Sequence, residues 1–329
     1  MQGNILVTGI TGFVGSHLAD YILEAFPDAT LWGTKRYHLS RMDNVRHIRE
    51  QVRWVDCDLT DAIGTREMIR EVKPDRIFHM AAESFVSPSW KHPHRYMSVN
   101  YDAMVNVLDA VRESGADTRI LIPGSGEEYG EIHEDEIPIG PETPLRPVNP
   151  YAVTKIAQDL IGYVYFKSYG TKVVRVRTFN HEGPRRDKVF GIPWYAYQVA
   201  RIEAGLQEPV VKVGHVDDLR NFTHVKDIVR AYCLAMEQCE PGELYLVGSE
   251  SESSIFTFRQ ALEQLIALST VSGITYQEDA RYVRPTNVPR LLADTSRFRE
   301  LTGWEPNIDF TTILSDTLNH WRERVAQGE

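Results

Sequence analysis

The amino-acid sequence predicts an α/β fold, a doubly wound parallel sheet with a smaller C-terminal α/β cap that binds substrate. Two observations carry this prediction. From residue 4 to about residue 180, short β-rich runs alternate with amphipathic stretches, the pattern of a parallel sheet covered by helices. Beyond residue 180 the segments are interrupted by Pro and Gly. We expect a sheet domain over residues 1–180 and a cap over 181–329, with segments near 215–245 that pack back onto the sheet domain.

Six segments are predicted strands of the sheet: Ile5–Thr8, Ala29–Gly33, Val52–Cys57, Arg76–Ala82, Arg119–Pro123 and Lys172–Thr178. Helices are expected where apolar residues recur at a spacing of three to four. They include Gly15–Phe26, Val99–Arg112, Trp194–Ala204, Val225–Glu237, Phe256–Leu268 and Ile313–Arg324. Ligands bind at the carboxyl ends of the strands in such sheets, so the cleft between sheet and cap is the expected site.

The composition excludes several classes of protein. The 329 residues are 42% hydrophobic and 25% charged, as in one compact unit or two closely packed lobes. A formal net charge of -10 leaves no broad basic surface for nucleic acid. The apolar runs are too short to cross a bilayer, and no signal peptide precedes the first strand, so we expect a soluble cytoplasmic protein. Cys57, Cys233 and Cys239 form neither a disulfide framework nor a metal quartet.

Three glycines follow the first predicted strand at a spacing of three and three: Gly9, Gly12 and Gly15. Gly9 permits a tight turn, Gly12 lets a pyrophosphate approach the backbone, and Gly15 permits close contact between helix and strand. Unpaired N–H groups at the helix start, near Phe13 and Val14, can bind phosphates. The sequence therefore predicts a Rossmann-type domain that binds a dinucleotide at these residues. A glycine-rich turn without a ligand is the alternative.

The end of the second predicted strand indicates which nicotinamide cofactor is bound. A carboxylate there would bind a ribose hydroxyl of NAD and repel the 2′-phosphate of NADP. This chain has Arg36 there, with Arg41 nearby and no acid, so we expect NADP rather than NAD. Ordinary surface cations are the alternative. Further candidates for the cofactor site follow the third and fourth strands: Asp58, Leu59, Ala81 and Ala82.

Tyr151 and Lys155 form the candidate acid–base pair. They follow Asn149 and Pro150, a capping residue and a proline that suit the start of a helix. A spacing of four puts both side chains on one face. Tyrosine serves as a base near neutral pH only if a cation stabilises its phenolate, and Lys155 is expected to supply that charge within the cofactor site. Such pairs also occur on surface helices, but the position downstream of the glycine motif favours catalysis.

Ser125 and Glu127 are the other two candidate catalytic residues. They stand at the end of the fifth predicted strand, where alternation places both on one side of the sheet and points Glu128 elsewhere. The Ser125 hydroxyl can share a substrate oxygen with Tyr151, and Glu127 can remove a proton from the adjoining carbon region. A solvated Glu at a turn is the alternative.

Polar residues after the sixth predicted strand should line the cleft, among them His181 and Arg186. Arg220 and Arg284 are candidates to bind a diphosphate, because a guanidinium offers forked donors; lone arginines are also common on surfaces. His79 and the other histidines lack a paired His or Asp spacing, so we expect no bound metal.

At this point the chain resembles the extended short-chain dehydrogenase/reductase family over essentially its whole length. The glycine motif, Ser125, Tyr151 and Lys155 match that family's cofactor and catalytic pattern. Within its nucleotide-sugar branch, four motifs resemble GDP-mannose 4,6-dehydratases: Ala82-Glu83-Ser84-Phe85-Val86, Ser125-Gly126-Glu127, Phe179-Asn180-His181-Glu182-Gly183-Pro184-Arg185-Arg186 and Arg284-Pro285-Thr286-Asn287-Val288. The resemblance implies that His181, Arg186 and the Arg36 region contact NADP. The substrate-binding residues that it implies are Ser84, Asn180, Arg220 and Arg284.

The resemblance implies conversion of a GDP-hexose to a GDP-4-keto-6-deoxyhexose by internal hydride transfer through bound NADP, in a homodimer or homotetramer. Three departures keep another activity open. Gly126 replaces the usual middle serine, an insertion common before the Arg-Pro motif is missing, and residues 208–214 and 220–223 look as much like GDP-4-keto-6-deoxymannose reductases. The alternatives are such an NADPH-dependent reductase, a nucleotide-sugar epimerase and, outside the enzymes, a catalytically silent NADP-binding regulatory protein.

Overall fold

The computed structural model describes every residue of the chain except 284, 287 and 289. In this part of the chain, seven parallel strands form the central sheet in the order β11-β6-β5-β4-β1-β2-β3. These strands are β1 Gly3–Thr8, β2 Ala29–Lys35, β3 Arg53–Asp56, β4 Arg76–His79, β5 Arg119–Ser125, β6 Lys172–Thr178 and β11 Leu244–Val247. The strand order reverses beside β1, so the doubly wound parallel sheet predicted from the sequence is confirmed.

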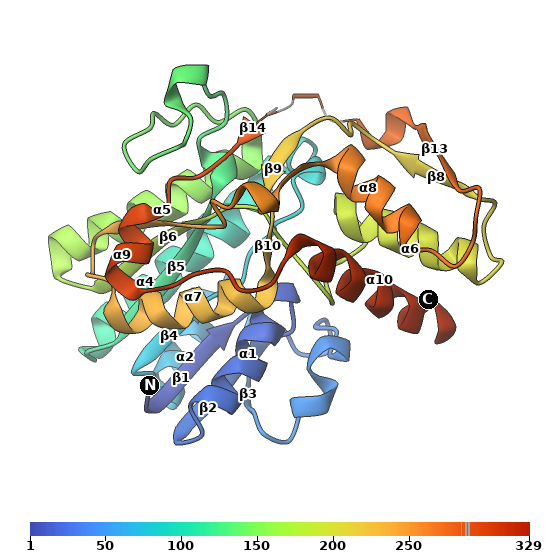
Figure 1. Cartoon of the computed structure of the whole chain (residues 1–329). Helices are drawn as coiled ribbons and strands as arrows, with labels where there is room; N and C mark the ends of the chain where they lie inside the picture. The colour runs from blue at the N-terminus through green and yellow to red at the C-terminus, as the bar shows by residue number, and fades with distance from the viewer. Residues whose placement is uncertain (284, 287, 289) are drawn as a thin grey trace.

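Helices cover both faces of this sheet (Figure 1). One face carries α1 (Phe13–Ala25) and α7 (Val225–Gln238), and the other carries α2 (Ala62–Val72), α4 (Ala103–Ser114) and α5 (Pro150–Tyr169). Successive residues of β1 show why two covers are needed. Val7 is buried in the α1–α7 core, and its neighbour Leu6 is buried in the α2–α4 core, because successive side chains of a strand point to opposite faces.

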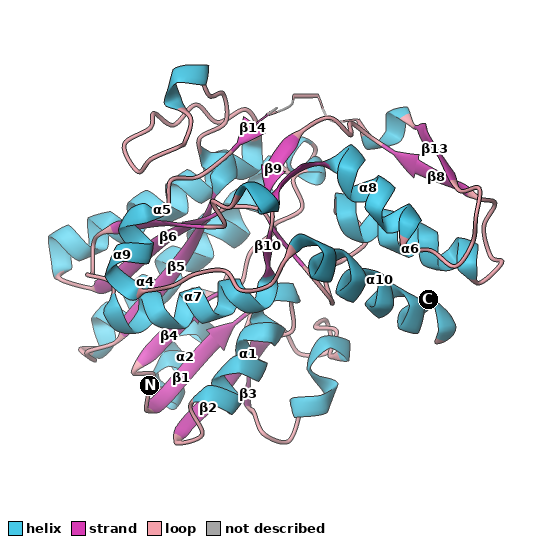
Figure 2. Cartoon of the chain, viewed as in Figure 1, coloured by secondary structure: helices cyan, strands magenta, loops and turns pink. Residues whose placement is uncertain are grey.

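The second region has its own core, shown beside the sheet domain in Figure 2. Its helices are α6 Gly191–Glu203, α8 Phe258–Ala267 and α10 Phe310–Ala326. Its short strands pair as β7 His181–Glu182 with β10 Thr223–His224, as β8 Val210–Val213 with β13 Thr275–Glu278, and as β9 Leu219–Asn221 with β12 Ile255–Thr257 and β14 Arg290–Leu291. The predicted smaller α/β cap is therefore present.

The chain returns to the sheet after the first cap segments. Helix α7 packs against α1, β11 pairs with β6, and α9 (Ser296–Thr302) packs on both α7 and β11. The return near 215–245 was expected, whereas β11 as a seventh strand was not predicted.

Several predicted boundaries differ from the structure by a few residues, and two of these differences have a clear structural cause. The fourth strand ends at His79 rather than Ala82, because the Ala81 N–H donates to the side-chain hydroxyl of Thr8 at 3.2 Å instead of to a backbone carbonyl of β1. The helix predicted from Phe256 begins at Phe258, because residues 255–257 pair antiparallel with β9.

Cys57, Cys233 and Cys239 are free and buried. Among the described residues, no helix is long and apolar enough to span a membrane. The same residues contain no group of three His, Cys, Asp or Glu side chains arranged to hold a metal ion.

Candidate active site

The glycine motif forms a tight turn between β1 and α1. Gly9 has φ of +62°, and a Cβ atom there would lie 2.7 Å from the Ala81 backbone nitrogen, so only glycine fits without strain. A Cβ atom at Gly15 would collide with the Gly9 carbonyl oxygen. Gly12 precedes α1 and has no side chain to cap it, and the first turn holds no acid. The α1 N-terminus therefore presents unpaired N–H groups, which favour an anion.

Aromatic and cationic side chains gather beside this helix start. The rings of Phe13 and His181 are stacked with centroids 5.8 Å apart, and the Arg186 guanidinium lies 5.5 Å from the Phe13 centroid. Arg186 also pairs with Glu182 at 3.1 Å. Burial lowers the pKa of His181 to about 4, so its ring is neutral near pH 7. The structure thus brings three predicted cofactor residues together, while Val14 packs against the core below them.

At the end of β2, Lys35 pairs with Asp56 of β3 at 2.5 Å, and Arg36 follows with no acid beside it in sequence. Arg36 is exposed, and its backbone N–H donates to Ser40 at 2.8 Å. Asp58 is half-buried nearby; burial opposes its ionisation, but hydrogen bonds from Thr60 lower its pKa overall. Leu59 is buried. Of the other predicted contacts, Ala82 is half-buried, as is Ala81 beside the glycine turn.

Helix α5 presents the acid–base pair. Asn149 caps the helix by accepting a hydrogen bond from the Ala152 N–H at 2.8 Å, and Pro150 occupies the first turn. Burial raises the pKa of Tyr151 well above its usual value, and the nearby Ser125 side chain opposes this rise only in part. Tyr151 is therefore a neutral phenol in this state.

The Lys155 side chain is bonded within its own helix. Its Nζ donates to Gln158 within α5, and the structure shows no bond from Lys155 to Tyr151 among the described residues. The spacing of four fixes the helix face but leaves the conformation of a long side chain open. Burial lowers the pKa of Lys155 to about 8, against the attraction of Glu128 and Asp159.

The strand alternation used to place Glu127 was wrong. The strand ends at Ser125, and Gly126–Glu128 form a 3-10 turn that Ser125 caps by accepting from the Glu127 N–H at 3.2 Å. The turn still separates the two carboxylates. Glu127 is half-buried near Tyr151 and accepts from Asn149 Nδ2 at 3.0 Å, whereas Glu128 points into the interior.

A buried ionic network beneath the site escaped the sequence analysis. Glu128 Oε2 lies 2.7 Å from Arg177 Nε, and Arg177 Nη2 donates to Asp159 at 2.6 Å. Glu128 Oε1 also accepts from the Ser125 N–H at 2.7 Å, so the network holds the backbone of a candidate catalytic residue. Burial raises the pKa of Glu128 to about 7, against the effect of Arg177. The available signal was a pair of arginines, Arg175 and Arg177, on one face of an otherwise apolar strand.

Packing against Phe179 explains why residue 126 is a glycine. A Cβ atom there would lie 3.1 Å from the Phe179 ring, tighter than an ordinary van der Waals contact. A side chain at this position would therefore crowd Phe179, so the serine usual in the dehydratases needs a displaced ring.

The predicted substrate residues are only partly assembled. Ser84 is exposed and Asn180 is half-buried at the end of β6. Arg220 is buried on β9, where its Nη1 donates to the Leu219 carbonyl at 2.9 Å. Arg284 lies outside the described residues. Sequence analysis also missed Asn100, a buried residue that joins the loop after β4 to α5 by accepting from the Glu83 N–H and donating to Thr154 Oγ1, both at 2.8 Å.

Comparisons with known proteins agree with this geometry. The family model described as GDP-mannose 4,6 dehydratase matches residues 6–317. A GDP-6-deoxy-D-mannose reductase of Pseudomonas aeruginosa is 31% identical over 328 residues, which cover 99% of this chain and 100% of the relative. A GDP-mannose 4,6-dehydratase of Yersinia enterocolitica is 32% identical over 350 residues, covering 95% and 92%.

The solved structure of RMD from Pseudomonas aeruginosa complexed with NADPH superposes with a TM-score of 0.83 at 28% identity, covering 98% of this chain and 100% of that chain. The resemblance inferred from the motifs is confirmed along almost the whole length. The chain belongs to the GDP-mannose 4,6-dehydratase family, within the extended short-chain dehydrogenase/reductases.

Proposed function

We propose that the protein is an NADP-dependent nucleotide-sugar 4,6-dehydratase that converts a GDP-hexose to a GDP-4-keto-6-deoxyhexose. The observation that carries this proposal is a second carboxylate at the site. Glu127 lies near the Ser125–Tyr151 hydroxyl pair, and the reduction of a ketone to an alcohol has no use for an additional base. Family membership supports the same reaction class.

The residues at the end of the sheet fit NADP. The close approach of backbone at Gly9 and the uncapped start of α1 suit a pyrophosphate, and Arg186 lies beside them. Arg36, with no acid at the end of β2, suits a 2′-phosphate. When bound, this cofactor supplies the acceptor and later the donor of a hydride.

Each protein group then has a separate proton to handle. Tyr151, beside Ser125, takes the proton of the sugar C4 hydroxyl as that carbon loses its hydride, and the ammonium of Lys155 favours the phenolate. The resulting 4-ketone acidifies the C5 hydrogen. Glu127 would remove that proton and pass it to the departing C6 hydroxyl, which leaves as water. After hydride returns to C6, Glu127 would pass a proton from solvent to C5, and Tyr151 would release the C4 hydroxyl proton to solvent. The cofactor ends in its starting redox state.

A 4-keto reductase is the second candidate function. It is favoured by the Pseudomonas aeruginosa reductase, whose full length this chain covers, whereas the Yersinia enterocolitica dehydratase is covered to 92%. Ser125, Tyr151 and Lys155 would serve both reactions, because each reaction moves one hydride and one hydroxyl proton at C4.

One experiment separates the two functions. Purified protein is incubated with GDP-mannose and a trace of NADP⁺, and the nucleotide sugar is followed by mass spectrometry. Loss of water from many more substrate molecules than cofactor molecules supports the dehydratase, and Glu127→Gln should stall this loss while it still binds NADP. An unchanged sugar, with NADPH consumed once a GDP-4-keto-6-deoxy sugar is offered, supports the reductase.

We further propose a homodimer or homotetramer. Four apolar residues of α5 are each 37–47% exposed, and their positions in the sequence place them in a stripe along the helix: Val153, Leu160, Tyr163 and Val164. A second copy of the chain would cover this stripe. Sedimentation of the protein and of Leu160→Glu tests this, because the charged variant should shift the protein toward a monomer. The cytoplasmic location remains a prediction.

A further inference from the structure

Asn149 connects the two halves of the candidate site. Its side chain is buried, with 6% of the residue exposed. Oδ1 accepts a hydrogen bond from the Ala152 N–H at 2.8 Å, which caps the helix that carries Tyr151. Nδ2 donates to Glu127 Oε2 at 3.0 Å. One carboxamide therefore joins the helix of the candidate acid–base tyrosine to the candidate C5 base.

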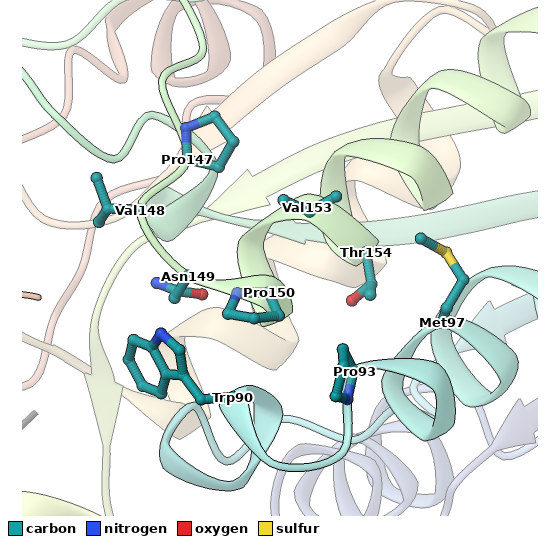
Figure 3. Close-up of a pocket in the computed structure, with 9 residues that line it drawn as sticks. All are labelled: Trp90, Pro93, Met97, Pro147, Val148, Asn149, Pro150, Val153 and Thr154. Atoms are coloured by element: carbon teal, nitrogen blue, oxygen red, sulfur yellow. The ribbon is translucent and has the colours of Figure 1, made fainter. Parts of the chain in front are cut away.

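The orientation of this carboxamide is determined by its partners. The Ala152 N–H group can only donate, so the atom that faces it must be the amide oxygen. The NH₂ group must then face Glu127. Figure 3 shows Asn149 next to Pro150 and above Trp90, in the lining of a pocket of about 350 Å³ with largely apolar walls. A hydrogen bond to a carboxylate is charge-assisted, and burial of Asn149 makes it stronger than the same bond in open water.

The bond leaves the two oxygens of Glu127 in different situations. Oε2 is occupied by Asn149, whereas Oε1 accepts no hydrogen bond from the part of the chain that the structure describes. A carboxylate held by one oxygen keeps its plane fixed and presents the other oxygen for proton transfer.

From this arrangement we infer that Asn149 is a positioning residue, which orients Glu127 for proton transfer at the sugar C5. The inference rests on the proposed dehydratase function. Capping alone does not require asparagine, because Ser and Asp cap helices equally well. Ionised Asp has no donor, and Ser has a single hydroxyl oxygen, whereas Asn uses two separate atoms, Oδ1 to accept from Ala152 and Nδ2 to donate to Glu127.

This difference supplies the test. Asn149→Ser and Asn149→Asp keep a capping oxygen and lose the Nδ2 group that reaches Glu127, and Asp also places a second negative charge beside Glu127. Both variants are mixed with GDP-mannose in heavy water after loading with NADP⁺. The rise of bound NADPH reports hydride loss from C4, and the appearance of product carrying deuterium at C5 reports the Glu127 step.

We expect Asn149→Ser to slow the deuterium-labelled product by about 10- to 100-fold, the effect of losing one hydrogen bond to a charged group. Hydride loss from C4 should stay within about twofold of the wild type, since the cap is retained. The acid limb of the pH–rate profile for Asn149→Asp should move to higher pH, because the added charge favours protonation of the carboxylate pair. In a Glu127→Gln background, Asn149→Ser should change neither rate further.

Three results would overturn the inference: equal slowing of both steps, no slowing of either, or an additive loss in the Glu127→Gln background. The first would reduce Asn149 to a helix cap, and a fall in Tm would accompany it. If the wild-type protein forms no dehydrated product at all, the proposed function itself fails and the role of Asn149 fails with it.

Discussion

Arg177→Met removes the central cation of the network beneath the site. Arg177 lies between Glu128 and Asp159, and its Nη1 also donates to the Tyr129 hydroxyl at 3.1 Å. The remaining carboxylates stay buried with fewer partners, a change that typically destabilises a protein by about 3–5 kcal/mol. With an unfolding entropy of about 2.1 cal/mol/K per residue, 329 residues convert this loss into a Tm lower by about 4–7 °C.

Urea titration at pH 8 and thermal unfolding measure this loss. Arg46→Met is the matched control, because Arg46 also pairs with an acid, Asp43 at 3.0 Å, but its side chain is 80% exposed. An exposed pair contributes about 0–1 kcal/mol. The loss of unfolding free energy in Arg177→Met should become smaller toward pH 6. Without Arg177 the buried acids bind protons more readily in the folded than in the unfolded chain, so lower pH stabilises the folded variant. A loss below about 1 kcal/mol at pH 8, equal to that of the control, would refute the reasoning.

Three other predictions concern the cofactor site and Lys155. Gly9→Ala should abolish NADP binding in calorimetry and destabilise more than Gly115→Ala, which has a similar φ of +66° but no neighbour within 4 Å of the added Cβ. Equal effects would contradict the close approach at Gly9. Lys155→Met should be inactive but more stable than the wild type below pH 8, because burial lowers the pKa of Lys155 to about 8 and the wild type must keep a buried ammonium there. This cost in stability disappears as pH rises from 8 toward the usual lysine pKa. The unfolding free energies of the two proteins, measured by urea titration, should therefore converge near pH 10. Arg36→Glu should weaken NADP relative to NAD by at least about 10-fold in competitive binding, and an unchanged ratio would remove Arg36 from the cofactor site.

The fold could be predicted because its signals are local. The glycine spacing, the capped start of α5 and the alternation of strand and helix each depend on neighbours in the chain. Strand β11 was missed because it has only four residues, all buried, and lies beyond residue 180, where Pro and Gly interrupt the alternation of strands and helices. A short apolar segment that is buried on both faces shows no alternation that marks it as a strand.

The geometry of the candidate site was harder to predict than the fold. Sequence spacing chose the residues but not the side-chain conformations, so it missed the bond of Lys155 to Gln158. It also used a strand rule beyond Ser125, where the chain had already turned. The turn forms because Glu128 reaches back to the Ser125 N–H and Ser125 accepts from the Glu127 N–H, a capping arrangement that competes with strand extension.

Two adjacent carboxylates therefore acquire different tasks through their surroundings. Glu128 is fully buried, bonds Arg177 and the Ser125 backbone, and cannot reach a substrate. Glu127 is half-buried and is held by the neutral Asn149. A cation in place of Asn149 would stabilise the charge of Glu127 and weaken it as a base, whereas an amide fixes its direction with less effect on its charge. The ion pair with Arg177 thus suits Glu128 to a structural role, and the hydrogen bond from the neutral Asn149 suits Glu127 to proton transfer, although the two acids are consecutive in sequence.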